Sequence, residues 1–473
     1  MAARKPAGFK LPHTLVLIYA LVIGVYALSL LIPSGEFKRV EKTVQGQTRL
    51  MTVPGTYAET PKHMLGPQWL LIAPVRGFQD GALIIFIILI FGGTFAILGK
   101  SGAIESGIQR LSRFFARKPR TQKFVIPVLM VVFSLAGGVY GMAEESIPFV
   151  LIFIPLALSL GYDSLVGVAI PFVGAAAGFG AAFFNPFTVG IAQGFSELPL
   201  YSGLTYRLIL WVINTVLSIV FVMIYAEKVR KDPKKSLVYD IDLARGYTAS
   251  EARAKELPWG PAQKTVLGIL LAGIVVLIYG ILAKGWYMEE IGALFLGIGL
   301  VAGPIAGIKP SDMARTFVSG AADLIGVALI IAGGRAILII LNQAVVLDTV
   351  LHAAAGLISS VPKILTAQIM FLMQAVINFF VHSGTAQAAL TMPVMSPLSD
   401  LVGITRQTTV LAFQLCEVVN PILPTSAVTM GVLGVAKIPW EKWAKWFLPL
   451  MLILVAFSLL ALIPPVLMKW GPF

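Results

Sequence analysis

Cysteine, histidine and charge are scarce in this chain. Its 473 residues include one cysteine and four histidines, and only 12% are charged. A lone Cys416 excludes an internal disulfide framework and is expected to serve packing, and four scattered histidines provide no Cys/His metal cluster. Soluble domains carry roughly 25% charged residues. The 57% hydrophobic content therefore predicts a polytopic membrane protein.

Motifs of enzymes and ATP-driven pumps are also missing. The sequence has no His-Glu-x-x-His motif, no convincing nucleophile–base pair and no Walker motif. We therefore expect neither an enzyme nor a cofactor. A channel is an alternative class, but channels line a pore with rings or stripes of polar residues. Here the polar residues gather at breaks in apolar segments, which favours a secondary transporter.

Several apolar runs are long enough to cross a bilayer, which takes about 20 residues. The first follows a short basic start and has no Ala-x-Ala cleavage site, so it is predicted to be a retained helix rather than a signal peptide. The uninterrupted spans are predicted at 14–32, 81–99, 204–226, 263–283, 288–307, 324–342 and 445–468.

Two further spans, 166–195 and 407–436, are interrupted by the pairs Asn185-Pro186 and Asn420-Pro421. A proline inside a helix removes one hydrogen bond and clashes with the carbonyl a turn earlier. Carbonyls freed in lipid cost several kcal/mol each unless they are satisfied. Two such breaks in matching halves predict a buried polar site at the membrane midplane.

Each broken span follows a region of two apolar arms around a small polar cluster. The arms are expected to be too short to span the bilayer, so both regions are predicted to be re-entrant hairpins. The first, 124–160, carries Glu144-Glu145-Ser146, and the second, 364–400, carries His382-Ser383-Gly384-Thr385. The halves align at a slowly drifting offset: 241 for Gly92-Gly93 with Gly333-Gly334, 238 for Pro155 with Pro393, and 235 for the Asn-Pro pairs.

Charge predicts the topology of these halves. With the N-terminus in the cytoplasm, the segments between spans hold 24 Lys and Arg residues inside and 10 outside, as the positive-inside rule requires. The first repeat then starts outside and the second inside, so the repeats are predicted to be inverted. The amphipathic, basic segment 104–118 is predicted to be an interfacial helix.

The predicted domains follow from this order. They are N-terminal scaffold helices at 1–120 with an extracellular loop at 33–80, a first transport-domain half at 121–226, a cytoplasmic linker at 227–262, a second scaffold half at 263–345 and a second transport-domain half at 360–473.

Intramembrane charges mark candidate site residues, because such charges are costly. Glu144 and Glu145 either cap the amides of the hairpin tip or face the site. Glu417 lies one turn before the Asn420 break and either binds a solute or pairs with Arg335. Arg335 in turn binds either Glu417 or the carboxylate of a substrate.

Neutral polar groups cluster at the same discontinuities. Each hydroxyl has the alternative of a bond to the preceding-turn carbonyl, and His382 is expected to be structural. The predicted substrate-binding groups among them are Ser146, Asn185, Ser383, Gly384, Thr385, Asn420 and Thr425. A Na⁺ site is predicted at Asn185, Thr188, Asn420 and Ser426.

These motifs resemble the YfcC/DcuC-like carriers of the ion transporter superfamily, which include C4-dicarboxylate carriers and relatives named as basic amino acid antiporters. The resemblance covers nearly the whole chain. It is carried by the two hairpin tips, by Phe184-Asn185-Pro186-Phe-Thr188 and by Glu417-Val-Val-Asn420-Pro421-Ile-Leu-Pro424-Thr425.

The resemblance implies an all-α homodimer of elevator transporters in the bacterial inner membrane. The Ser-Asn-Thr tip motif of the dicarboxylate relatives is not intact here. Three glutamates against one Arg335 also argue for a cationic substrate, because a desolvated amine needs a carboxylate partner. The sequence therefore predicts a carrier of an arginine-, ornithine- or lysine-like amino acid, working by exchange or coupled to Na⁺ or H⁺. A C4-dicarboxylate carrier is the alternative.

Overall fold

The computed structural model describes residues 14–44, 47–53, 55–116, 119–245, 259–359 and 362–471. This part of the chain is mostly helical and contains nine helices that are long and apolar enough to cross a membrane. The predicted polytopic helical class is therefore confirmed. The basic N-terminal segment 1–13 and residues 246–258 of the predicted linker lie outside the described residues.

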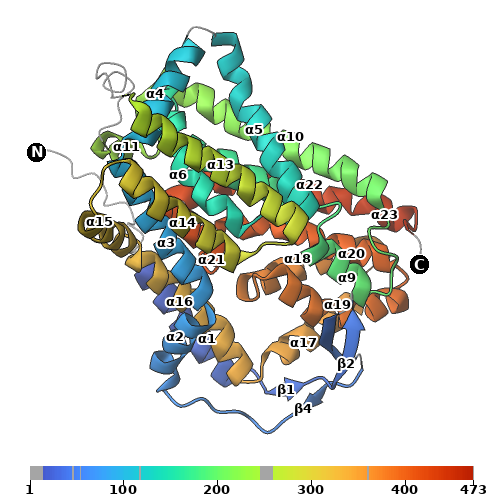
Figure 1. The fold of residues 1–473 in the computed structure, drawn as a ribbon. Coiled ribbons are helices and arrows are strands. Elements are labelled where there is room, and N and C mark those ends of the chain that lie inside the picture. The colour runs from blue at the N-terminus through green and yellow to red at the C-terminus, as the bar shows by residue number, and fades with distance from the viewer. Residues whose placement is uncertain are drawn as a thin grey trace, which may run out of the picture.

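All seven uninterrupted spans are helices within a few residues of the predicted bounds (Figure 1). Their high mean hydropathy, 2.7 in the second span, makes them helical because a bilayer leaves backbone groups no partner except each other. The spans are α1 (Thr14–Leu31), α3 (Ala82–Lys100), α10 (Leu204–Lys231), α13 (Pro261–Lys284), α14 (Met288–Ile305), α16 (Ile325–Gln343) and α22 (Trp440–Ala461), which is followed by α23 (Ile463–Leu467).

Both predicted hairpins consist of two helices around a short tip. In the first hairpin, α5 (Pro119–Tyr140) and α6 (Ile147–Ser159) flank the tip at 141–146. In the second, α18 (Lys363–Phe380) and α19 (Gly384–Val402) flank residues 381–383. The expectation of uniformly short arms is wrong for α5, whose residues 123–140 are apolar and long enough to span a membrane.

Both broken spans are interrupted where the Asn-Pro pairs predict. The first consists of α7 (Ser164–Val168), the π-helical turn η2 (Ala169–Val173), α8 (Gly174–Gly180), an irregular stretch, the turn η3 (Pro186–Gly190) and α9 (Ile191–Phe195). The second consists of α20 (Arg406–Leu415), the 3₁₀ turn η5 (Cys416–Ile422), a turn at 423–426 and α21 (Ala427–Val435).

Shorter elements lie between the spans, and three of the helices were not predicted. These are α2 (Trp69–Asp80), α15 (Pro310–Ala322) and α17 (Leu347–Ser359), each of 12 or 13 residues and therefore too short to span a bilayer. The predicted interfacial helix is α4 (Ala103–Ala116). The remaining elements are η1 (Glu144–Ser146), η4 (Pro233–Lys235), α11 (Tyr239–Ala244), and the strands β1 (Gly35–Glu36), β2 (Arg39–Val44), β3 (Gln47–Thr52) and β4 (Ala58–Glu59).

The loop predicted at 33–80 is more ordered than expected. Its strands form two antiparallel pairs, β1 with β4 and β2 with β3. Arg39 pairs with Asp348 of α17 at 2.8 Å, which ties this loop to the second half of the chain. Its last twelve residues form α2, which packs against α16.

Contacts between loops define two opposite faces. On the face that we call inner, the side chain of Gln263 donates to Ser101, Lys442 pairs with Asp240, and Lys437 pairs with Asp323. On the face that we call outer, Arg406 pairs with Glu197, and Thr405 donates to the carbonyl of Trp470. These groupings match the inside and outside segments that the charge count predicts.

The two hairpins reach into the molecule from different faces. The first ends close to Asp163, which accepts hydrogen bonds from Tyr225 and Ser236 near the inner face. The second ends at Asp400, which pairs with Arg406 on the outer face. Each tip therefore lies between the faces.

The halves also pack in a reciprocal way. Helix α2 crosses α16, and helix α15 crosses α3. Both crossings use glycines at equivalent positions: a Cβ on Gly77 would lie 2.2 Å from the carbonyl oxygen of Ala332, and one on Gly320 would lie 2.3 Å from that of Gly92. Small residues of this kind let membrane helices approach closely.

The crossing of α5 and α8, which positions the first tip, is expected to be intolerant of a side chain at Gly178. A Cβ there would lie 1.8 Å from the carbonyl oxygen of Ser134. Overpacking typically costs about 1–3 kcal/mol, so Gly178→Ala should lower the melting temperature of the purified protein by several degrees. Gly268→Ala in α13 is the matched control, since its new Cβ meets nothing within 4 Å. Equal melting temperatures for the two variants would contradict this packing.

Candidate functional site

The tips and breaks of both halves line one pocket of about 350 Å³. The first half contributes residues 141–145 of its tip together with Phe187 and Thr188. The second half contributes His382 to Thr385 of its tip together with Glu417, Asn420, Pro421 and Ser426. Segments more than 200 residues apart in sequence thus meet at one polar cavity.

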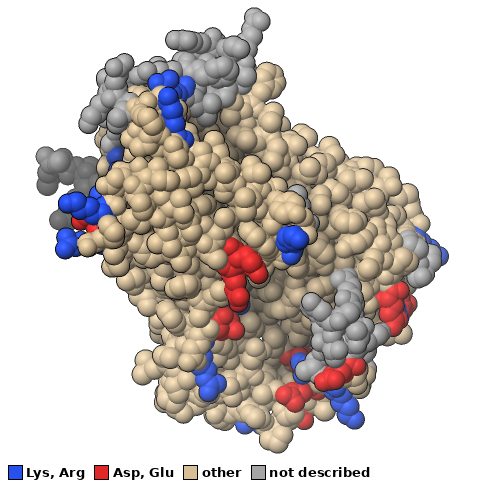
Figure 2. Space-filling view, viewed as in Figure 1, with Lys and Arg blue, Asp and Glu red and all other residues tan. Residues whose placement is uncertain are grey.

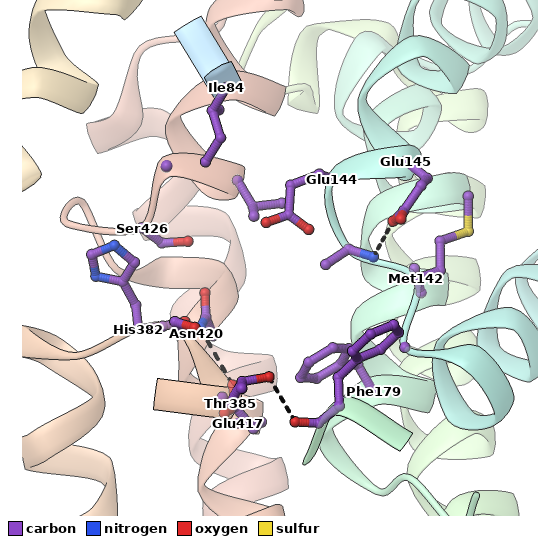
Figure 3. A pocket seen from close by; sticks show the side chains of 18 of the residues that line it. Ile84, Met142, Glu144, Glu145, Phe179, His382, Thr385, Glu417, Asn420 and Ser426 are labelled. Carbon is purple, nitrogen blue, oxygen red and sulfur yellow. Dashed lines mark hydrogen bonds between the residues drawn. The ribbon is translucent and has the colours of Figure 1, made fainter. Parts of the chain in front are cut away.

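The two glutamates of the first tip have different surroundings. The Glu145 carboxylate accepts a hydrogen bond from the backbone N–H of Ala143 at 2.9 Å and is buried. It therefore caps the tip. Glu144 is half-buried and lines the pocket, and Figure 3 shows it pointing from the first tip towards the side that carries Ser426 and His382. Of the two, Glu144 is the carboxylate placed to meet a solute.

Glu417 lies under the second tip. One carboxylate oxygen accepts a 3.4 Å hydrogen bond from Asn420, whereas the other is buried without a partner among the described residues. A Cβ on Gly384 would lie 3.1 Å from the latter oxygen, so the tip backbone closes over it. The same Cβ would lie 2.5 Å from the Thr188 methyl group, so a larger residue would need these neighbours to move, and Glu417 is 2% exposed.

The Asn residues of the breaks hold the tips. Asn420 donates to the carbonyl of His382 at 3.3 Å. Asn185 accepts from the backbone N–H of Phe187 at 2.9 Å and packs against Gly141, which has a φ of +77°. Thr385 of the second tip donates to the carbonyl of Phe187 at 2.8 Å, and this bond links the two halves across the pocket.

Arg335 does not pair with Glu417, which is one of the two carboxylates considered for it; the other is that of a substrate. Arg335 instead forms an ion pair with Asp80, with 3.3 Å between Nη1 and Oδ2. The reason is the crossing of α2 over α16, because α2 was taken as part of a loop and Asp80 ends it. Both residues line the pocket, and Asp80 is half-exposed.

Three predicted site residues do not line the pocket. Ser146 is fully buried and donates to the carbonyl of Ala143 at 2.6 Å. Asn185 is fully buried beneath the first tip. Thr425 donates to the carbonyl of Phe379 at 2.8 Å and so ties its break to the end of α18. Of the two hydroxyls, only Ser146 makes the predicted bond to a carbonyl of the preceding turn, because Thr425 bonds to a different helix.

Three of the four groups predicted to hold Na⁺ lie at the pocket. Thr188, Asn420 and Ser426 line the pocket, but Asn185 does not. Ser426 caps α21 by accepting from the backbone N–H of Thr429 at 3.4 Å. Among the described residues no group of three or more His, Cys, Asp and Glu side chains is arranged to hold a metal ion.

Sequence reasoning missed the aromatic and acidic rim of the pocket. Phe172, Phe179 and Tyr287 line it together with Asp80. Tyr287 directly precedes α14, which begins with the exposed residues Glu289 and Glu290. Figure 2 shows acidic side chains in the middle of one face of the molecule. Asp80 directly precedes the predicted span 81–99, and this position is the sequence signal that could have identified it.

His382 has an unusual position for a residue expected to be structural. It lines the pocket at the second tip, and neither ring nitrogen has a hydrogen-bond partner among the described residues. It occupies the position in the second tip that Glu144 occupies in the first. The imidazole is therefore free to accept or donate a hydrogen bond to a solute.

Comparisons with known proteins point to transporters. Residues 11–466 match the family described as C4-dicarboxylate anaerobic carrier, DcuC. The "Putative basic amino acid antiporter YfcC" of Escherichia coli K12 is 35% identical and covers 92% of each chain, and an uncharacterized protein of Haemophilus influenzae is 25% identical over 95% of this chain and 96% of its own. The YdaH transporter of Alcanivorax borkumensis, at 16% identity, aligns over 98% of this chain and 100% of its own with a TM-score of 0.42.

The family match spans nearly the whole chain, including both hairpins and both broken spans. The family is described as a carrier and the YfcC relative is named as an antiporter, in agreement with the helices long enough to cross a membrane. The chain is a membrane transporter that belongs to the DcuC family of C4-dicarboxylate anaerobic carriers, within which it resembles YfcC.

Proposed function

We propose that this transporter carries a cationic amino acid of the arginine, lysine or ornithine type. The observation that carries the proposal is the charge balance of the pocket. Arg335 is already paired with Asp80, so among the described residues Glu144, Glu145 and Glu417 have no cationic partner within 4 Å. Buried carboxylates need a positive partner, and a substrate with two amino groups or a guanidinium provides one.

The pocket also suits the other parts of such a molecule. Its volume lies within the range typical of small-molecule sites. Phe172, Phe179 and Phe187 provide apolar surface for an aliphatic chain, and aromatic faces attract a cation. The start of α19 at Gly384 directs backbone N–H groups at the cavity edge, where an α-carboxylate gains from the helix dipole.

The name of the YfcC relative, a basic amino acid antiporter, supports this substrate. The family description supports a C4-dicarboxylate instead, and Arg335 is the group that favours this second candidate. A dianion in the pocket would face three glutamates, however, and Arg335 would have to leave Asp80 to reach it. We therefore place the cationic amino acid first.

We further propose an elevator mechanism with inverted repeats in a homodimer of the bacterial inner membrane, with the N-terminus in the cytoplasm. The opposite directions of the two hairpins and the reciprocal crossings of α2 and α15 support the repeats. Asp323 follows α15 as Asp80 ends α2, at an offset of 243. Asp80 lines the pocket, whereas Asp323 pairs with Lys437 at the inner face. If the pocket moved from the end of α2, where Asp80 lies, to the end of α15, where Asp323 lies, it would open to the opposite side of the membrane.

Two modes of coupling belong to this proposal: exchange of one amino acid for another, and coupling to Na⁺ or H⁺. The carbonyls of Pro421 and Ile422 already accept hydrogen bonds from Trp443 and Trp440 at 2.7 and 2.8 Å. These two carbonyl oxygens are therefore not available to bind Na⁺. This favours exchange over coupling to Na⁺.

Uptake into proteoliposomes tests the substrate. Vesicles loaded with unlabelled arginine should accumulate labelled arginine, lysine or ornithine, and fumarate or succinate should not compete. Glu144→Gln should lower this uptake at least tenfold, since each lost charge contact of about 1.4 kcal/mol costs a factor of ten. Glu59→Gln, an exposed change in β4, is the control. Competition by succinate, with no effect of the cationic amino acids, would select the dicarboxylate.

Glu417→Gln should separate stability from transport. The change removes a buried charge that lacks a cationic partner and keeps the side-chain shape, so the substrate-free protein should melt at an equal or higher temperature, by roughly 2 °C. Transport should fall at least tenfold. Unchanged uptake in this variant would remove Glu417 from the site, and a large loss of stability would show that its charge is already paired.

Accessibility from both sides tests the elevator motion. Ser383 is an exposed residue of the second tip, and Cys416 is buried. In a Cys416→Ser background, Ser383→Cys should react with a membrane-impermeant thiol reagent added to either side of the membrane, and saturating substrate should slow both reactions. Labelling from one side only, under all substrate conditions, would contradict alternating access at this tip.

A further inference from the structure

Arg207 is a buried cation outside the pocket. It lies in the first turn of α10 and is 1% exposed. Its Nη2 donates to the side-chain oxygen of Gln407 at 3.3 Å, whereas Nε and Nη1 have no hydrogen-bond partner among the described residues. A charge buried without a counter-charge costs several kcal/mol. The position therefore calls for an anion.

The carboxylates of this region are engaged elsewhere. Glu197 and Asp400 both pair with Arg406, at 3.0 and 2.8 Å. The residues around Arg207 are neutral: Gln407, and through it Gln193 and Ser202. In the described part of the chain, Arg207 is thus separated from every acidic partner by more than the 4 Å of an ion pair.

The position of Arg207 in its helix also favours an anion. Arg207 belongs to the N-terminal turn of a 28-residue helix, where unpaired backbone N–H groups and the helix dipole attract negative charge. The Nε2 atoms of Gln193 and Gln407 both donate to the Ser202 hydroxyl, so the donors left for a ligand are Nε and Nη1 of Arg207.

We propose that Arg207 is the centre of a binding site for a small monovalent anion, with chloride as its ligand. One positive charge is balanced by one negative charge, whereas a phosphate or sulfate dianion would leave an excess negative charge in a buried place. A guanidinium is weakly hydrated, and the Trp470 ring lies 5.8 Å from its central carbon. This dehydrated setting suits a halide.

The site has a structural consequence at the outer face. Gln407 begins the second broken span, Gln193 belongs to α9 of the first, and Arg207 begins α10. An anion at Arg207 therefore joins both broken spans to the helix that follows them. Its binding free energy adds to the stability of this arrangement, because a ligand that binds only the folded state stabilises it.

Chloride dependence of thermal stability tests the site. The purified protein should be melted in sodium gluconate with increasing chloride at constant ionic strength, where wild type should gain several degrees as chloride rises. Arg207→Gln should lose this gain. Arg406→Gln is the matched control, an arginine of the same face that is paired with two carboxylates, and it should keep the gain.

Two further measurements guard against a variant that fails to fold. Arg207→Lys retains the charge with fewer donors, so it should need more chloride for the same gain. Crystals of wild type grown in bromide should show an anomalous peak beside Arg207. The proposal would be overturned if the melting temperature of wild type did not change with chloride, or if Arg207→Gln kept the chloride-dependent gain. Bromide bound only at other places would also overturn it.

Discussion

The architecture depends on how backbone groups freed at the two breaks are satisfied inside the bilayer. In the first broken span, Asn214 donates to the carbonyl of Ala177 at 2.7 Å and Gln414 donates to that of Phe179 at 2.6 Å. In the second, Thr429, Trp440 and Trp443 satisfy the carbonyls of residues 420–422. Because lipid offers no such donors, each broken span is held by polar side chains of neighbouring helices.

This arrangement decides where the chemistry of the pocket comes from. The backbone at the breaks is largely occupied, so side chains set the charge of the cavity. The two tips have a similar backbone arrangement but are capped by different side chains. Glu145 caps the first tip, and Ser383 caps the second by accepting a hydrogen bond from the backbone N–H of Ala386. Glu144 and His382, at equivalent positions of the two tips, both line the pocket.

Much of the architecture could be predicted from sequence because lipid enforces it. Length and hydropathy locate seven spans, and the Asn-Pro pairs locate both breaks. Helices α2, α15 and α17 could not be predicted in this way, because helices of 12 or 13 residues carry no membrane-length signal. Because α2 was not predicted, the ion pair of Arg335 with Asp80, the last residue of α2, was not predicted either.

The side chains of the site were harder to predict than its location. Ser146, Asn185 and Thr425 have the residue types expected in a binding site, but each bonds to or packs on a neighbouring tip or helix. The pattern of apolar arms around a polar cluster places a residue at a tip. The direction of its side chain depends on which backbone groups lie nearest. Glu144 and Glu145 are adjacent in sequence and still take different roles for this reason.

The charge of the pocket also bears on the mode of transport that we propose. A pocket with uncompensated carboxylates carries its charge into the low-dielectric part of the bilayer when it moves empty, and such transfer is costly. A bound cationic amino acid lowers that cost, so the loaded carrier would cross more easily than the empty one. Exchange of one cationic solute for another follows from this difference, without a separate coupling ion. The acids that recognise the solute would then also prevent the carrier from returning empty.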